Sequence, residues 1–200
     1  MSLDATVALI PLIAAKTFLK ITVNDEDAIL ESLINNMSGV IKQYCGRKFI
    51  LEIFTEYYDG SGTNFLVLSN YPIISLDNLY MDTQRLWGTD SVINIADDVQ
   101  VEKASGIIRL WNNQSVFLCG KANVKVVYHA GYDAVPYDIQ HACTLMVQHS
   151  YRRQYLDQRT GLVSETIGDR NVTYANEDIP KPAKTILDRY RRQGISTYAY

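Results

Sequence analysis

The chain has 200 residues, 47% hydrophobic and 20% charged, a composition typical of a globular protein that can bury a core without disulfides or metals. Its 22 acidic residues outnumber its 19 basic ones, so the net charge is −3. A protein that binds nucleic acid through the phosphates usually has a clear excess of basic residues, which this chain as a whole lacks. Cys45, Cys119 and Cys143 are far apart in the sequence and form no CxxC pair, which argues against a disulfide framework or a zinc knuckle.

The stretch ATVALIPLIAA at 5–15 is apolar but has no basic segment before it. We therefore expect no signal peptide. We also expect no membrane span, because no apolar run approaches the roughly 20 residues that a span requires. Residues 11–21 are instead predicted to form a short helix with Pro11 near its start.

The clearest helical signal covers residues 25–45. Asn24 is suited to cap the N-terminus, and the acidic residues 25–27 fall in the first turn, where the helix dipole favours anions. Apolar residues recur at steps of three and four, and Gly46 suits the C-terminal cap. The apolar stripe consists of Leu30, Leu33, Ile34, Met37, Val40, Ile41 and Tyr44.

Between Ile50 and Tyr132 the hydrophobic period changes to two, which predicts β-strands. The sequence DGSG at 59–62 is expected to be a turn between two strands rather than a phosphate-binding loop. Further turn signals follow at 97–98 and 105–106. The region is predicted to be an antiparallel meander or a small barrel of about six or seven strands.

Helical periodicity returns at Pro136, in an amphipathic helix that ends in the basic, tyrosine-rich run 151–155. A further helix is predicted over 181–193, with Pro182 in its first turn and Gly194 as its stop.

The segment SETIGDRNVTY at 164–174 lies between these two helices. It predicts a turn at Gly168 and a short strand or extended arm over 172–174. The segment ISTYAY at 195–200 also alternates. It suits either an extended strand that adds to a partner's sheet edge or a frayed end of the chain.

Together these patterns predict an α+β fold, a small antiparallel bundle of about four helices with an inserted antiparallel β meander or small barrel. Residues 1–49 and 133–194 would form the bundle, with a loop at 159–179. Residues 50–132 would form the β insertion, and 195–200 an extended tail.

The sequence contains none of the common catalytic or nucleotide-binding motifs GxSxG, P-loop and GxGxxG. His141 and His149 are eight residues apart on one predicted helix, too far to share a metal as an i, i+4 pair can. Cys143 falls in an apolar stripe and is expected to be a core residue. We therefore expect no catalytic residue, no metal ligand and no cofactor, and an enzyme with a site assembled from scattered residues is our third hypothesis.

Basic residues concentrate late in the chain, where nine basic minus six acidic residues over 152–192 leave an excess of three. A solvated helix face, a protein-contact surface and a nucleic-acid site all fit this pattern, in that order. The basic residues are Arg152, Arg153, Arg159, Arg170, Lys181, Lys184, Arg189, Arg191 and Arg192.

Five sequence blocks follow one another in an order that is more specific than any single motif. They are TVNDEDAILESLI ending in YCGRKF, YYDGSGTNFLVLSNYPI, VKVVYHAGYDAVPYDIQHACTLMVQHSYRR, SETIGDRNVTY and PKPAKTILDRYRR. Over about 11–193 the chain resembles the head–tail connector (adaptor or head-completion) proteins of tailed double-stranded DNA phages.

The resemblance implies a structural virion protein at the head–tail interface, assembled in the cytoplasm of a bacterial host. Such proteins bind under the portal as a ring, usually of twelve copies, extend the DNA channel and dock the next stopper, neck or tail protein. Genomic DNA would pass through without tight binding, for which a net charge of −3 is suitable, and no membrane would be involved. The alternative is a nucleic-acid-binding module that uses the C-terminal arginines.

Within this resemblance we expect the late arginines, the turn-and-strand segment and the tail to contact neighbouring subunits, the portal or the channel. The candidate residues are Arg152, Arg153, Gly168, Asp169, Arg170, Val172, Tyr174, Arg189, Arg191, Arg192, Tyr198 and Tyr200.

Overall fold

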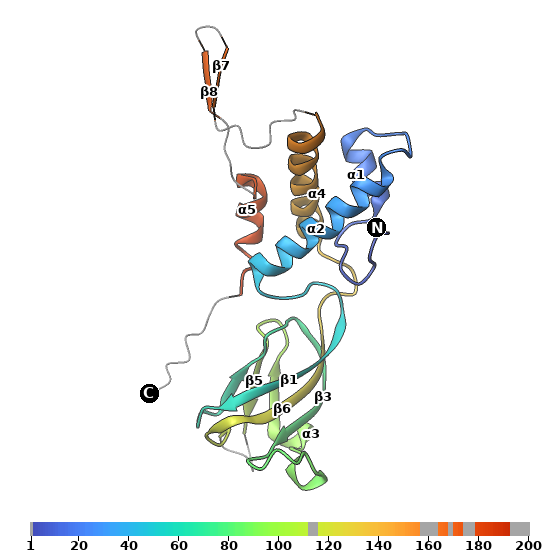
Figure 1. Ribbon diagram of the computed structural model, residues 1–200. Helices are drawn as coiled ribbons and strands as arrows, with labels where there is room; N and C mark the ends of the chain where they lie inside the picture. The colour runs from blue at the N-terminus through green and yellow to red at the C-terminus, as the bar shows by residue number, and fades with distance from the viewer. Residues whose placement is uncertain (1, 112–115, 157–163, 168–169, 174–178, 193–200) are drawn as a thin grey trace. The chain divides into compact units, whose positions relative to one another are not determined.

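The computed structural model describes residues 2–111, 116–156, 164–167, 170–173 and 179–192. The chain divides into two compact units (Figure 1). Arg47–Ala134 forms the β unit, and the described residues before and after it form the helical unit. The predicted α+β class is confirmed, and the described strands form two three-stranded sheets and one hairpin rather than a closed barrel.

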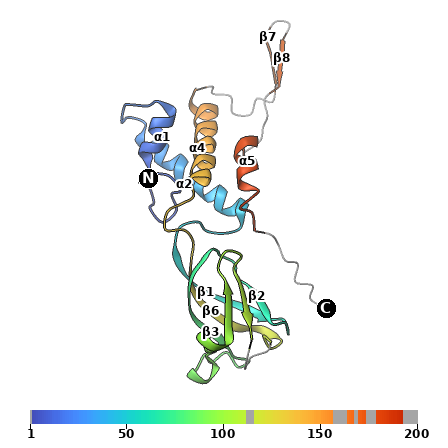
Figure 2. The ribbon, with the colours of Figure 1, turned by 180° about the vertical axis from the view of Figure 1, so that it is seen from behind.

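The helical unit is a small bundle in which α4 contacts α1, α2 and α5 (Figure 2). Its core is the apolar stripe predicted from the sequence, with Leu30, Ile34 and Ile41 fully buried, and Cys143 is buried as expected. The helices are α1 (Leu12–Leu19), α2 (Asp27–Cys45), α4 (Tyr137–Tyr151) and α5 (Lys181–Leu187), and a π-helical turn, η2 (Arg152–Leu156), follows α4.

Two helix ends differ from the sequence prediction. α2 begins at Asp27, and Asn24 does not cap it, because the Asn24 side chain accepts a hydrogen bond from Lys16 Nζ instead. α5 ends at Leu187 rather than near residue 193, since the chain turns back towards α2. The N–H of Arg192 donates to the carbonyl oxygen of Cys45 at 2.8 Å.

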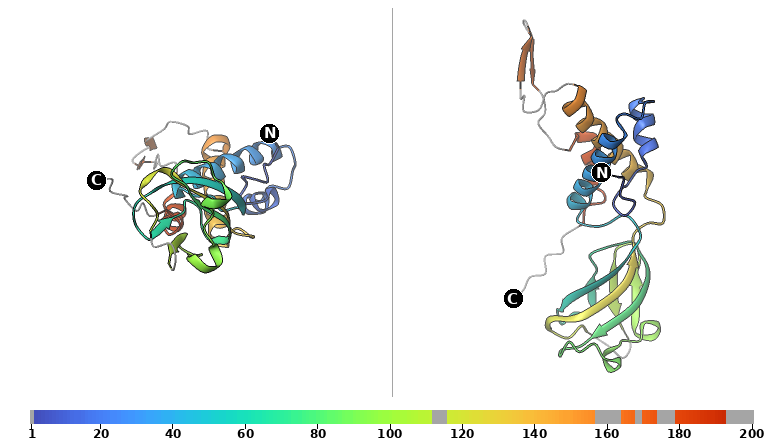
Figure 3. Two further views of the ribbon diagram at one scale, coloured as in Figure 1. Left: turned by 90° about the horizontal axis from the view of Figure 1, so that it is seen from below. Right: turned by 45° about the vertical axis from the view of Figure 1, so that its right-hand side comes forward.

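The β unit contains two antiparallel sheets with strand orders β1-β6-β3 and β2-β5-β4. In the right panel of Figure 3, the long strands β1, β6 and β3 lie side by side. The strands are β1 (Glu52–Gly60), β2 (Phe65–Val67), β3 (Ile73–Met81), β4 (Val99–Glu102), β5 (Ile107–Leu110) and β6 (Gly120–Ala130). Two short helices, η1 (Thr89–Ser91) and α3 (Ile95–Asp98), lie between β3 and β4.

The turn at DGSG forms where it was predicted, but it joins strands of different sheets. β1 pairs with β6, and β2 pairs with β5. The alternation of β6 therefore directs Val124, Val126 and Tyr128 into a core shared by residues of both sheets.

One carboxylate inside the β unit gathers three donors. Glu56 accepts hydrogen bonds from the Tyr58 hydroxyl, from the Tyr128 hydroxyl at 2.7 Å and from Asn70 Nδ2 at 3.1 Å. The Tyr128 hydroxyl in turn accepts from the Asn70 backbone N–H at 3.2 Å. Burial raises the pKa of Tyr58 to about 12 and raises the pKa of Tyr128 well above its ordinary value, so both hydroxyls remain donors.

The two ends of the β unit are joined at a close backbone approach. Ile50 and Tyr132 form a parallel bridge, and the Tyr132 N–H donates to the Phe49 carbonyl at 2.9 Å. Gly131 has φ of +121°, and a Cβ at this position would lie 2.5 Å from the Ile50 carbonyl oxygen. Both the conformation and the spacing require glycine here.

We predict that Gly131→Ala lowers the free energy of unfolding of the β unit by about 2–4 kcal/mol, through backbone strain and the clash with Ile50. Both tryptophans lie in the β unit, so tryptophan emission during urea unfolding measures the change. The matched control is Gly39→Ala in α2, where nothing lies within 4 Å of the added Cβ. It should stabilise the helical unit by about 0.5–1 kcal/mol, which circular dichroism at 222 nm measures, and leave the unfolding reported by tryptophan emission unchanged. An equal shift of the tryptophan-detected transition in both variants would contradict the prediction.

We also predict that Tyr128→Phe lowers the free energy of unfolding by about 1–3 kcal/mol, because it leaves the Asn70 N–H and one lone pair of Glu56 without their partner inside the core. The same urea experiment measures it. The control is Tyr57→Phe on the outer face, where the side chain is 53% exposed and the change should stay within about 0.5 kcal/mol.

Candidate functional site

The structure separates the predicted arginines into two groups. Arg152 and Arg153 follow α4, whereas Arg189, Arg191 and Arg192 follow α5. The Tyr190 hydroxyl donates to both Asp138 carboxylate oxygens, at 2.7 and 2.8 Å, which holds the end of α5 against the start of α4. Since the 15 residues of α4 span about 22 Å, the two groups lie at opposite ends of this helix.

The three arginines after α5, the α5-end arginines, are all exposed. The Arg191 guanidinium lies 5.6 Å from the centroid of the Tyr44 ring. The Tyr44 hydroxyl donates to Asp188, and this hydrogen bond raises the pKa of Tyr44. The chain is therefore fixed against α2 while its cationic side chains face solvent, as a contact surface for another molecule requires.

The two arginines after α4, the α4-end arginines, stand on the η2 turn. Arg152 is exposed, whereas Arg153 is half-buried and has an interaction partner. The Tyr151 hydroxyl donates to Glu26, and this bond raises the pKa of Tyr151 to about 12. The Tyr151 and Tyr155 rings stack with centroids 5.7 Å apart, so the turn that presents these arginines is itself packed.

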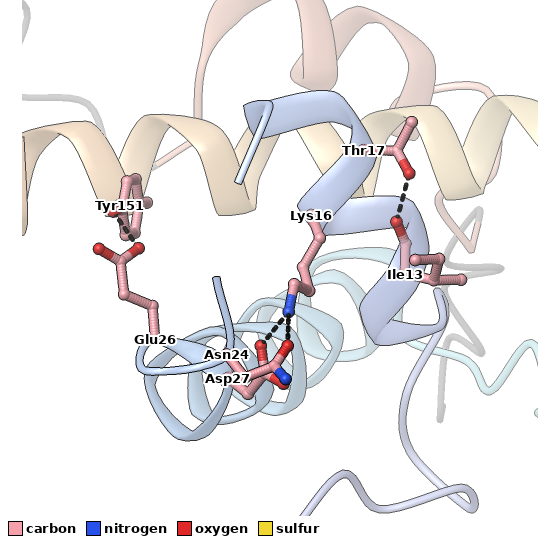
Figure 4. Close-up of polar contacts among 7 residues, drawn as sticks. All are labelled: Ile13, Lys16, Thr17, Asn24, Glu26, Asp27 and Tyr151. Carbon is pink, nitrogen blue, oxygen red and sulfur yellow. Dashed lines mark hydrogen bonds and ion pairs between the residues drawn. The ribbon is translucent and has the colours of Figure 1, made fainter. Parts of the chain in front are cut away.

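A second polar contact fixes the same end of the helical unit (Figure 4). Lys16 of α1 is 8% exposed, and its Nζ contacts Asn24 Oδ1 at 2.8 Å and Asp27 Oδ1 at 2.6 Å. α1 is thereby tied to the start of α2, and Glu26, beside Asp27, holds Tyr151. These contacts join α1, α2 and α4 next to the α4-end arginines.

The predicted turn-and-strand segment forms an antiparallel hairpin of β7 (Ser164–Ile167) and β8 (Arg170–Thr173). The candidate residues Arg170 and Val172 both lie in β8. A two-stranded hairpin is at best marginally stable alone, so a packing partner would favour it. The remaining candidates, Gly168, Asp169, Tyr174, Tyr198 and Tyr200, lie outside the described residues.

The β unit carries an aromatic surface that sequence reasoning missed. Lys125 of β6 pairs in register with Tyr57 of β1 and with Tyr80 of β3, which puts the three residues in one row across the sheet. The Trp87 ring packs 5.5 Å from the Tyr57 ring and 6.4 Å from the Tyr80 ring. The row depends on strand register between distant segments, which the sequence alone does not provide.

The loop that carries Trp87 is held by one carboxylate. Asp82 accepts the backbone N–H groups of Gln84, Leu86 and Trp87, each at 2.8 Å, and the Trp87 N–H is the largest cause of its lowered pKa. Arg85 and Trp87 have φ of 62° and 55°, which costs free energy in residues other than glycine. The result is a fixed loop whose Leu86 side chain is 76% exposed.

The described residues contain no group of three or more His, Cys, Asp or Glu that could hold a metal ion. A helix long and apolar enough to cross a membrane is likewise not found among them. The described geometry instead places exposed arginines, tyrosines and a constrained loop on the surfaces of the two units.

We predict that Asp82→Ala releases the loop, because three backbone donors lose their shared acceptor. Amide hydrogen exchange at Gln84, Leu86 and Trp87 should accelerate, and Trp87 emission should shift to the red when Trp111→Phe removes the second tryptophan. Lowering the pH should also release the loop in the wild type. Because the pKa of Asp82 is lowered, its carboxylate orders the loop at pH values above that pKa and no longer does so below it. Asp90→Ala, at an exposed position on η1, is the control, and equal exchange in both variants would contradict the prediction.

Comparisons with known proteins agree with this architecture. No curated protein sequence matches the chain. A chain from the neck of an empty gene transfer agent (GTA) particle, computed with C6 symmetry, has a TM-score of 0.63 and 14% identity, with 98% of this chain and 94% of that chain covered. A chain from the virion of the native GTA particle has a TM-score of 0.60 and 14% identity, with coverages of 94% and 91%.

A third chain, from the neck of a native GTA particle computed with C12 symmetry, has a TM-score of 0.57 and 15% identity, with coverages of 98% and 97%. At these identities the likeness shows a shared fold. The family model of head completion proteins matches residues 8–193, almost the whole chain. The chain therefore belongs to the head completion protein family, as the order of its sequence blocks predicted.

Proposed function

We propose that this protein is a structural component of a virion neck, a head–tail adaptor that forms a ring under the portal. The ring extends the DNA channel and docks the next neck or tail protein. The observation that carries the proposal is the family match over 8–193, and the likeness of nearly the whole chain to neck chains of particles computed with C6 and C12 symmetry supports it.

The exposed surfaces of the helical unit are consistent with a ring. A closed ring needs two different patches on each subunit, because each contact is heterologous. The helical unit offers two cationic surfaces at opposite ends of α4, together with the β7–β8 hairpin. We assign the α5-end arginines, the α4-end arginines and the hairpin to contacts with neighbouring subunits, the portal or the channel.

The charge distribution favours a conduit over a tight DNA-binding module. Each phosphate that a protein neutralises adds affinity through counterion release, which would hold DNA that has to slide. The net charge is −3, and the five arginines that would have formed a basic cluster are divided between two ends of the bundle.

We predict that the double substitution Arg191→Glu and Arg192→Glu weakens ring assembly or portal docking about 30-fold or more, equivalent to about 2 kcal/mol, because it reverses two exposed interfacial charges. Light scattering and electron microscopy with the cognate portal protein measure the effect. Circular dichroism should show an unchanged fold.

The matched control is Lys103→Glu with Lys121→Glu, which makes the same charge change at two exposed positions of the β unit. Normal docking by the Arg191/Arg192 variant would contradict the interface assignment. Failure of the wild type to bind portal or to form a ring under any condition would overturn the proposed function. Steeply salt-dependent binding to duplex DNA would favour the nucleic-acid alternative instead.

A further inference from the structure

The side of β1 that faces away from β6, here called the β1 edge, is open. β1 is the outer strand in the order β1-β6-β3, and among the described residues its backbone pairs with β6. The register is continuous from Glu52↔Ala130 to Tyr58↔Val124. An edge of this kind presents a row of N–H and C=O groups that can pair with a further strand.

The two edges of this sheet are built differently. β3, the opposite outer strand, is interrupted by register shifts between Ile73 and Ser75 and between Leu76 and Asn78, and such irregularities discourage further pairing. β1 has no shift between Glu52 and Tyr58 and contains neither proline nor lysine. Of the two outer strands of this sheet, β1 therefore has the more regular edge for accepting another strand.

The side chains along β1 would also accept an apolar partner. Ile53 is 63% exposed and Tyr57 is 53% exposed, with the exposed Thr55 between them. The carboxylates in this stretch are already engaged, Glu52 by Lys48 and Glu56 by two tyrosine hydroxyls. A strand laid along this edge would cover apolar surface without leaving a carboxylate unpaired.

A suitable strand exists in the same chain. Residues 193–200, here called the tail arm, lie outside the described residues and read QGISTYAY, with no charged side chain and with alternating apolar positions. The arm starts from a fixed point, because the Arg192 N–H donates to the Cys45 carbonyl at 2.8 Å. Residues 195–200 would span about 20 Å as a strand, the length of the six residues from Ile53 to Tyr58.

We propose that the tail arm of one copy adds to the β1 edge of a second copy, as a fourth strand beside β1-β6-β3. This inference rests on the proposed ring. An arm and an edge are two different patches, so each subunit gives one strand and receives one, as a heterologous ring requires. Aromatic residues of the arm, Tyr198 and Tyr200, would then form cross-strand contacts with Ile53 and Tyr57.

Two defective variants of the full chain test this proposal by complementation. The first lacks residues 195–200 and keeps its edge. The second keeps its arm and carries Ile53→Lys and Thr55→Lys, two exposed positions where lysine discourages edge pairing. Its matched control carries Ile74→Lys and Ser75→Lys on β3, the opposite edge strand, at positions that are also exposed.

In sedimentation velocity at high protein concentration, each defective variant alone should remain monomeric. Their equimolar mixture should give a species of twice the monomer mass, with slowed amide exchange in Glu52–Tyr58 of the arm-deleted copy. The β3 control should self-associate as the wild type does. A mixture that stays monomeric, or an arm that protects the β1 edge of its own chain, would overturn the proposal.

A portal experiment separates this inference from the proposed function. Arm-deleted protein that forms normal rings on the portal would overturn the arm-to-edge contact and leave the adaptor function standing. Wild-type protein that forms no ring and does not bind the portal would remove the proposed function itself.

Discussion

The fold of the β unit depends on one constraint. This unit is inserted between two parts of the helical unit in the sequence, so its first and last strands must start and end close together. The Ile50–Tyr132 bridge and the Phe49–Tyr132 hydrogen bond bring the entering and leaving strands together, and Gly131 allows them to approach. From this point β1 and β6 run antiparallel, so the last strand of the insertion becomes the central strand of its sheet. Since β6 is then flanked by β1 and β3, the remaining strands pair elsewhere, as the second sheet. The open edge of β1 follows from the same constraint, because closing the insertion uses one side of β1 and leaves the other.

A polar network stabilises the interior that this arrangement creates. Glu56 is half-buried, where an unpaired carboxylate would be costly, and it accepts hydrogen bonds from three donors in β1, β6 and the segment after β2. These donors come from both sides of the turn that separates the sheets. The network therefore fixes how the β2 segment lies against β1, which apolar packing alone would specify less strictly. It also explains an unusual choice in the sequence, a glutamate at a core-facing position between Phe54 and Tyr58.

Local signals in the sequence predicted local structure well. The apolar stripe of α2, its Gly46 cap, the amphipathic pattern of α4 and the change of period at Ile50 require no distant partner, and each corresponds to an observed element. The order of the blocks was sufficient to predict the family. What the sequence could not provide are choices between distant partners, such as β6 rather than β2 beside β1, or Lys16 rather than a backbone N–H as the donor to Asn24. The candidate site was affected in the same way, because the arginines that the sequence analysis grouped as one late cluster lie at opposite ends of α4. The row of Tyr57, Lys125 and Tyr80 became visible only with the register.

The arrangement of surfaces also bears on where the proposed ring would assemble. Subunits that associated strongly in solution would close into rings before they met the portal. A contact made by an eight-residue arm has a large ordering cost, about 1–2 kcal/mol of backbone entropy per residue. Such a contact requires a high protein concentration between two free copies and becomes stronger when a template holds neighbours at high effective concentration. Charged surfaces such as the α5-end arginines can recruit a subunit to that template, because electrostatic attraction acts at longer range than strand pairing. Recruitment by charge followed by closure through strand addition would therefore favour closure of the proposed ring on the portal over closure in dilute solution.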